Sequence, residues 1–179
     1  RVMLFTGRLD KEKGIHKAIR VMPEIVKEYP DTIFIITGDG PYKNQIINYI
    51  KKLNVEDNVR LVGRVPYDEI INYYFSAKIL LFPTLRWEGL PYTLIEALAC
   101  GICIVTSNFG GGATIVEDGV NGLLVDPHNH NEIVSAIKKI FADPELESKL
   151  RENAKEFAKK YLSLKNMVDS TESVIIEAV

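Results

Sequence analysis

The segment Gly7–Gly14 combines glycines with two cations that could bind a phosphorylated ligand. Arg8 offers a planar fork of donors, and Lys13 stands at a helix start, where backbone N–H groups already favour an anion. These residue types suit a pyrophosphate. They fit equally a solvated basic turn with surface ion pairs to Asp10 and Glu12, so the pattern alone leaves both interpretations open.

A second segment with chemical potential begins at Glu88 and ends at Glu96. Pro91 marks the first turn of a helix, and Gly89 and Leu90 leave N–H groups free near its positive end. The two carboxylates can accept hydrogen bonds from sugar hydroxyls, and the free N–H groups can donate hydrogen bonds to phosphate. The plainer alternatives are a favourable charge at the helix N-terminus for Glu88 and a salt bridge for Glu96.

Two other groups of reactive residues could suggest redox chemistry or metal binding, but neither interpretation is favoured. Cys100 closes an apolar helix and Cys103 enters a strand, so we interpret this C-x-x-C as two buried small apolar residues in a reducing cytosol. Asp126, His128 and His130 could bind a metal in principle, but a solvated loop is the better interpretation. No metal site is expected.

The elements that must position these residues alternate along the chain. Most of the short runs rich in β-branched or apolar residues are continuous, which is typical of strands buried on both faces of a parallel sheet. The predicted strands are 2–6, 32–37, 59–62, 78–82, 102–106 and 122–125, and the predicted helices are 15–28, 42–53, 67–76, 92–100, 129–141, 144–161 and 163–179. The pattern predicts a doubly wound, Rossmann-like α/β domain of about six strands with helices on both faces.

Composition excludes several classes of protein. The 179 residues carry 22 Lys+Arg against 24 Asp+Glu, which argues against nucleic-acid binding. A hydrophobic content of 46% argues against disorder, and no apolar run approaches the ~20 residues of a membrane span. The chain starts directly in a strand-like run without a methionine or a signal peptide, so we expect one domain, 1–179, cut from a larger protein.

Ligands of such sheets bind beyond the carboxyl ends of the strands. The segments that follow the first five predicted strands are Gly7-Arg8, Gly38-Asp39-Gly40-Pro41, Gly63-Arg64, Pro83 to Glu88, and Ser107 to Gly112. Gly38-x-Gly40 is a weak dinucleotide fingerprint, because Lys43 stands where the third glycine belongs. A strand-to-helix turn is the better interpretation of these two glycines.

Taken in order, the motifs resemble the C-terminal domain of retaining glycosyltransferases of the group 1 (family 4) type, which have the two-domain GT-B fold. The resemblance covers nearly the whole chain. It rests on Gly-Arg-Leu-x-x-x-Lys-Gly at 7–14, Gly-Asp-Gly-Pro at 38–41, Leu-Val-Gly-Arg-Val at 61–65, the Glu-x7-Glu block at 88–96 and the segment 117–125. It implies transfer of a hexose-type sugar from a UDP-, GDP- or ADP-linked donor to an acceptor hydroxyl, with retention and without a metal.

The resemblance also implies residue roles. Arg8 and Lys13 hold the diphosphate and stabilise the leaving group, and Glu88 contacts the donor sugar, so these three form the predicted catalytic set. Glu96 accepts hydrogen bonds from the ribose hydroxyls, and Arg64 lies beside the base. The other implied donor-binding residues are Gly7, Gly38, Gly40, Val65, Gly89, Leu90, Pro91, Gly110 and Gly111, with the glycine cluster extending to Gly112.

Two positions depart from the family pattern. Thr114 stands where the family often has Glu after the fifth strand, and this could reflect a different donor. The family's Gly-x-Pro-Val becomes Gly-Ile-Cys-Ile at 101–104, which we interpret as structural.

The resemblance places the acceptor site, for a sugar, a lipid-linked or another hydroxyl, in an N-terminal domain absent from this chain. We therefore expect little or no transferase activity from the chain alone, and a cytoplasmic parent enzyme whose contact with a membrane is left open. A non-catalytic nucleotide-sugar sensor is the main alternative, but it could dispense with Glu88. A dehydrogenase would need more glycines in the first loop, and a glycosyl phosphorylase a pyridoxal-binding lysine.

Overall fold

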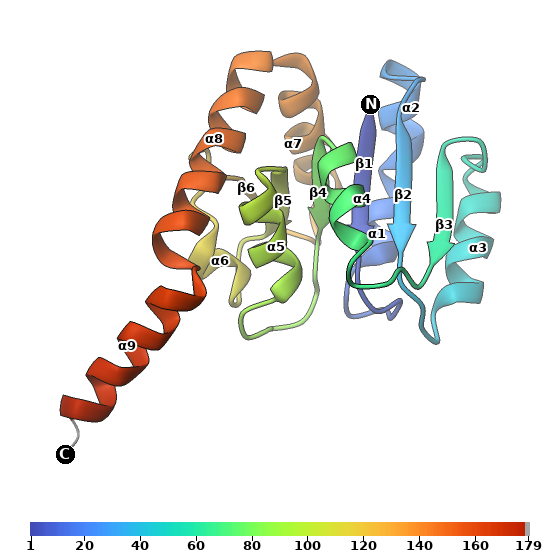
Figure 1. Ribbon diagram of the computed structural model, residues 1–179. Helices are drawn as coiled ribbons and strands as arrows, with labels where there is room; N and C mark the ends of the chain where they lie inside the picture. Colours follow the sequence, from blue (N-terminus) through green and yellow to red (C-terminus); the bar gives the residue numbers. More distant parts are fainter. Residues whose placement is uncertain (178–179) are drawn as a thin grey trace.

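The computed structural model describes residues 1–177 and shows one six-stranded sheet surrounded by helices (Figure 1). The strands are β1 (Val2–Thr6), β2 (Ile33–Thr37), β3 (Val59–Gly63), β4 (Ile79–Phe82), β5 (Cys103–Ser107) and β6 (Leu123–Val125). All neighbouring strands are parallel, in the order β3-β2-β1-β4-β5-β6. This is a doubly wound arrangement, and the predicted fold class is confirmed.

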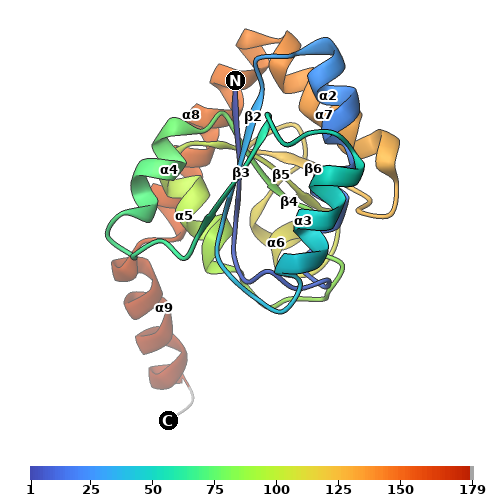
Figure 2. The same cartoon turned by 90° about the vertical axis from the view of Figure 1, so that its right-hand side faces the viewer.

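Helices cover both faces of the sheet. They are α1 (Ile15–Arg20), α2 (Met22–Glu28), α3 (Lys43–Lys52), α4 (Ile70–Ser76), α5 (Tyr92–Cys100), α6 (Gly112–Ile115), α7 (His130–Ala142), α8 (Pro144–Tyr161) and α9 (Leu164–Glu177). Figure 2 shows α2, α3 and α7 on one face and α4 and α5 on the other, and α8 packs against α5. No helix within residues 1–177 is both long and apolar enough to span a membrane.

Two helix predictions need correction, and one short helix was not predicted. The predicted helix 15–28 is two helices, because Pro23 has no N–H with which to continue the first one. The predicted helix 67–76 begins only at Ile70, after a turn in which the Glu69 and Ile70 N–H groups donate to the Pro66 carbonyl. The unpredicted helix is α6, which begins at Gly112 of the glycine cluster.

The continuous apolar runs become buried strands. All residues of β4 and β5 are buried, as are Met3, Leu4 and Phe5 of β1. Cys103 belongs to this core, where burial raises the pKa of its thiol to about 12. The prediction of two buried cysteines is correct for Cys103 alone, since Cys100 at the end of α5 is only half-buried.

His16 on α1 is a buried histidine that makes the stability of the domain depend on pH. It is 6% exposed, lies against Tyr42 and Tyr49, and burial together with the charges of Lys17 and Arg20 lowers its pKa to about 4. Between pH 6.5 and about 4, the His16 imidazole is therefore protonated in the unfolded chain and neutral in the folded chain. This stabilisation is complete above pH 6.5 and is lost as the pH falls towards 4, by roughly 3 kcal/mol.

Urea unfolding at pH 7, 5 and 4 tests this expectation. The His16→Leu variant should lose that part of the pH dependence, whereas His128→Gln, at an exposed histidine, should keep it. Parallel pH profiles for His16→Leu and the unchanged chain would contradict it.

Candidate functional site

The strand order reverses between β1 and β4, and open α/β sheets bind their ligands in the crevice at such a point. The loops that follow these two strands flank this point. The loop after β1 spans 7–14 and the loop after β4 spans 83–91. Both segments singled out in the sequence therefore meet at the place where open α/β sheets bind their ligands.

Lys13 and Glu88 join these two loops. The Lys13 Nζ lies 2.6 Å from Glu88 Oε1 and 2.7 Å from Oε2, although the residues are 75 positions apart. Their side chains are 23% and 13% exposed, and Thr84 Oγ1 lies 3.1 Å from Glu88 Oε1. The two loops at the point where the strand order reverses thus hold a cation and a carboxylate together, and both side chains remain partly exposed.

Arg8 does not join this pair. Its side chain is 71% exposed, and its Nε lies 3.8 Å from Asp10 Oδ2, which is one of the surface pairs of the basic-turn interpretation. Glu12 instead pairs with Arg86 of the loop after β4, at 3.5 Å. Lys13 therefore lies between the two loops, whereas the side chain of Arg8 is exposed to solvent.

Glycines allow the loops of this edge to touch through their backbones. A Cβ at Gly14 would lie 1.8 Å from the Pro83 carbonyl oxygen, and one at Gly111 would lie 1.6 Å from that of Gly89. A Cβ at Gly38 would likewise lie 1.9 Å from the Gly7 carbonyl oxygen, and one at Gly40 would lie 2.3 Å from that of Leu9. These contacts give the glycines a packing role, which supports the turn interpretation of Gly38-x-Gly40.

Backbone hydrogen bonds also connect the neighbouring loops at this edge of the sheet. The Gly38 N–H donates to the Gly63 carbonyl at 2.6 Å, that of Leu85 to Glu12 at 2.7 Å, and that of Gly111 to Glu88 at 2.8 Å. These bonds join the loop after β2 to the last residue of β3, the loop after β1 to the loop after β4, and the loop after β4 to the loop after β5.

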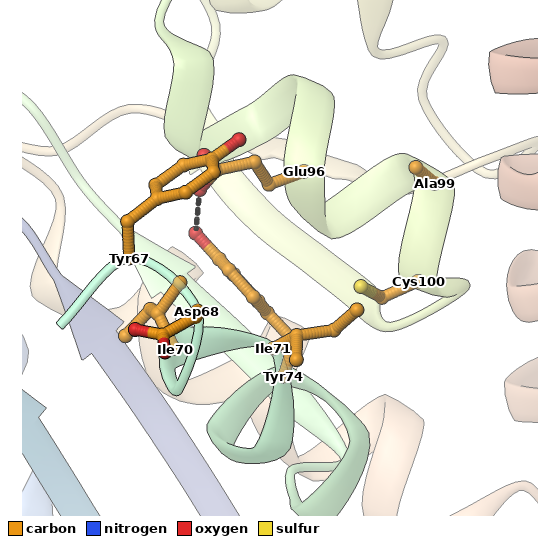
Figure 3. Close-up of a pocket in the computed structure, with 8 residues that line it drawn as sticks. All are labelled: Tyr67, Asp68, Ile70, Ile71, Tyr74, Glu96, Ala99 and Cys100. Carbon is orange, nitrogen blue, oxygen red and sulfur yellow. Dashed lines mark hydrogen bonds between the residues drawn. The ribbon is translucent and has the colours of Figure 1, made fainter. Parts of the chain in front are cut away.

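Glu96 lies on α5, next to a pocket of about 320 Å³ between α4 and α5 (Figure 3). The alternative of a salt bridge is wrong: within the described chain no cation lies within 4 Å of Glu96, and the Tyr74 hydroxyl donates to its Oε2 at 2.8 Å. Sequence reasoning missed Tyr74, since one tyrosine on a predicted amphipathic helix carries no distinguishing signal.

The remaining predicted residues lie along the same edge. Arg64 is exposed and Val65 half-buried, directly after β3. Pro91 is the N-cap of α5 rather than its first helical residue. The Thr114 hydroxyl donates to the carbonyl of Gly111, the N-cap of its own helix α6, at 2.7 Å.

An aromatic pair lies beside the site, and the residues weighed as metal ligands do not form a metal site within the described chain. Trp87 is exposed and stacks on Phe109 with ring centroids 6.1 Å apart, which joins the loops after β4 and β5 a second time. His130, weighed above as a metal ligand, pairs with Glu24 at 2.5 Å. Within residues 1–177 no three His, Cys, Asp or Glu side chains gather into a metal-binding group.

Known proteins are similar to this chain in sequence and in fold. Residues 1–157 match the family described as glycosyl transferases group 1. An uncharacterized glycosyltransferase of Methanocaldococcus jannaschii is 33% identical over 158 residues, which cover 88% of this chain and 43% of the relative. The chain spans less than half the length of the curated relatives it matches.

Two solved structures share the fold. Anabaena HepE in complex with UDP has a TM-score of 0.90 at 22% identity, covering 99% of this chain and 49% of that one. The C-terminal domain of LpcC from Francisella tularensis has a TM-score of 0.83 at 22% identity, covering 91% of this chain and 86% of that one. With the family match over residues 1–157, the conclusion is that this chain belongs to the group 1 glycosyltransferases.

Proposed function

We propose that this chain is the donor-binding domain of a retaining glycosyltransferase and binds a nucleoside diphosphate sugar. The observation that carries the proposal is the contact between Lys13 and Glu88 across the crevice. It sets a cation for the diphosphate beside a carboxylate for sugar hydroxyls, on facing loops at the edge where α/β sheets bind ligands. The UDP bound in the structurally similar HepE supports the same ligand class.

The chemistry is that of a departing diphosphate. As the bond between a hexose-type sugar and the phosphate breaks, charge develops on the nucleoside diphosphate and the sugar approaches an oxocarbenium ion. Lys13, the exposed cation Arg8 and the first N–H groups of α5 would stabilise this charge in place of a metal, and Arg64 would lie beside the base. A lysine carries three donors, so Lys13 can hold Glu88 and a phosphate oxygen at once.

The remaining parts of the proposal concern the whole protein. Residues 1–179 form the donor domain, and a sugar, lipid-linked or other hydroxyl acceptor binds a second domain outside this chain. Transfer therefore needs both domains, and the chain alone has little or no activity. The free thiols of Cys100 and Cys103 fit a reducing cytoplasm.

Thermal unfolding with UDP, GDP or ADP, each in EDTA, tests the proposal. One of them is expected to stabilise the chain, because a ligand at ~100 times its Kd adds about 2.7 kcal/mol and moves the midpoint by several degrees. A cooperative transition that none of the three nucleotides shifts would contradict it. Repeating the series with magnesium separates a metal-free site from one that needs a divalent cation.

A further inference from the structure

The hydroxyl of Tyr74 is buried against the carboxylate of Glu96. Tyr74 belongs to α4 and is 2% exposed, and Glu96 lies on the neighbouring helix α5. The Tyr74 Oη is 2.8 Å from Glu96 Oε2 and 3.4 Å from the Thr93 carbonyl oxygen. Figure 3 shows the tyrosine ring reaching across the gap between the helices, with its hydroxyl at the carboxylate.

Tyr74 acts as a donor in this bond. Burial, and after it the charge of Glu96, raise the pKa of Tyr74 well above its usual value, so the hydroxyl keeps its proton. A neutral partner orients Glu96 without cancelling its charge. Within residues 1–177, Glu96 Oε1 accepts no hydrogen bond, so one oxygen is fixed and the other is left for a ligand.

The pocket beside Glu96 limits what that ligand can be. Its walls include Tyr67, Ile70, Ile71 and Ala99. A carboxylate only accepts hydrogen bonds, so its partner must be a donor, and the two adjacent hydroxyls of a ribose provide donors at close spacing. An oriented carboxylate recognises such a diol better than a freely rotating one, because the ligand does not have to order it.

We propose that Tyr74 is a positioning residue that orients Glu96 toward the ribose and thereby gives the site its preference for ribonucleotides over 2′-deoxyribonucleotides. The proposal rests on the proposed function. Tyr74 does not touch the nucleotide itself and acts only through Glu96.

Calorimetric titration of the 179-residue chain tests this role. UDP, GDP and ADP are compared with their 2′-deoxy forms in the unchanged chain, in Tyr74→Phe and in Tyr73→Phe. Tyr73 is the matched control, since it is the neighbouring tyrosine on α4, packs against the core and has no bond to Glu96. Tyr74→Phe should lower affinity for the ribonucleotide by roughly three- to tenfold and that for the deoxynucleotide far less. Tyr73→Phe should change neither.

A double-mutant cycle separates positioning from a general structural effect. In the Glu96→Ala background, Tyr74→Phe should no longer alter ribonucleotide affinity, because its target is gone. Equal losses for both sugars, or the same loss with and without Glu96, would overturn the inference while leaving the proposed function intact. Failure of all three ribonucleotides to bind the unchanged chain would overturn both. Thermal unfolding of each variant confirms that it is folded.

Discussion

Replacing Lys13 with alanine is expected to weaken binding of the nucleoside diphosphate roughly 10- to 100-fold, as measured by titration calorimetry. The Lys13 side chain is only 23% exposed, and a partly buried charge acts more strongly than one on an open surface. Its removal also leaves Glu88 unneutralised beside the phosphates. Loss of the donor and the remaining negative charge weaken binding together, which makes this the largest effect expected on the ligand.

Two variants separate this effect from a general change in charge. Lys11→Ala removes the same charge from an exposed residue of the same loop and should change the affinity little. Glu88→Gln removes the carboxylate 2.6 Å from Lys13 and should bind the diphosphate a few-fold more tightly, which is the opposite sign. Equal losses in Lys11→Ala and Lys13→Ala would show that only the overall charge matters.

Replacing Gly14 with alanine is expected to destabilise the fold by about 3 kcal/mol or more, measured by urea unfolding. Gly14 has φ +72°, and a Cβ there would lie 1.8 Å from the Pro83 carbonyl oxygen. That atom belongs to the backbone, so it cannot move aside as a flexible side chain would. The loops after β1 and β4 would have to separate, which breaks the Leu85–Glu12 hydrogen bond and moves Lys13 away from Glu88.

Gly119 provides a matched control. It has φ +71°, almost the same value, but a Cβ there meets no atom within 4 Å. Gly119→Ala should therefore show only the strain of the left-handed conformation, about 1 kcal/mol. Similar losses of stability in the two variants would mean that backbone conformation, rather than the contact between loops, is what matters at Gly14.

The sequence predicted the sheet well because its strands are buried on both faces. A continuous apolar run such as Ile79–Phe82 leaves few alternatives, and all six predicted strands are present within a residue or two. The helices were harder to place, because Met22 and Val26 continue the apolar spacing of Ile15 and Ile19 across the break between α1 and α2 at Val21. The four-residue helix α6 is too short to show any periodicity.

The sequence predicted at which edge of the sheet the site lies, but not which of its side chains contact one another. Glycines and charges after successive strands place Lys13 and Glu88 at the same end of the sheet. Their direct pairing depends on how two loops 75 residues apart pack together, and nothing local in the sequence encodes it. The Tyr74–Glu96 bond is hidden in the same way, since it forms between two helices whose spacing only the folded core defines.

The glycine contacts at the carboxyl edge restrict how this domain can diverge. Because neighbouring loops meet backbone to backbone at Gly14, Gly38 and Gly111, no one of them can lengthen or shift without displacing the next. New ligand preferences are therefore more accessible through exchanges of projecting side chains, such as Arg64 or Trp87, than through insertions. Related domains can in this way bind different donor sugars or nucleotides while the backbone of these loops stays nearly constant.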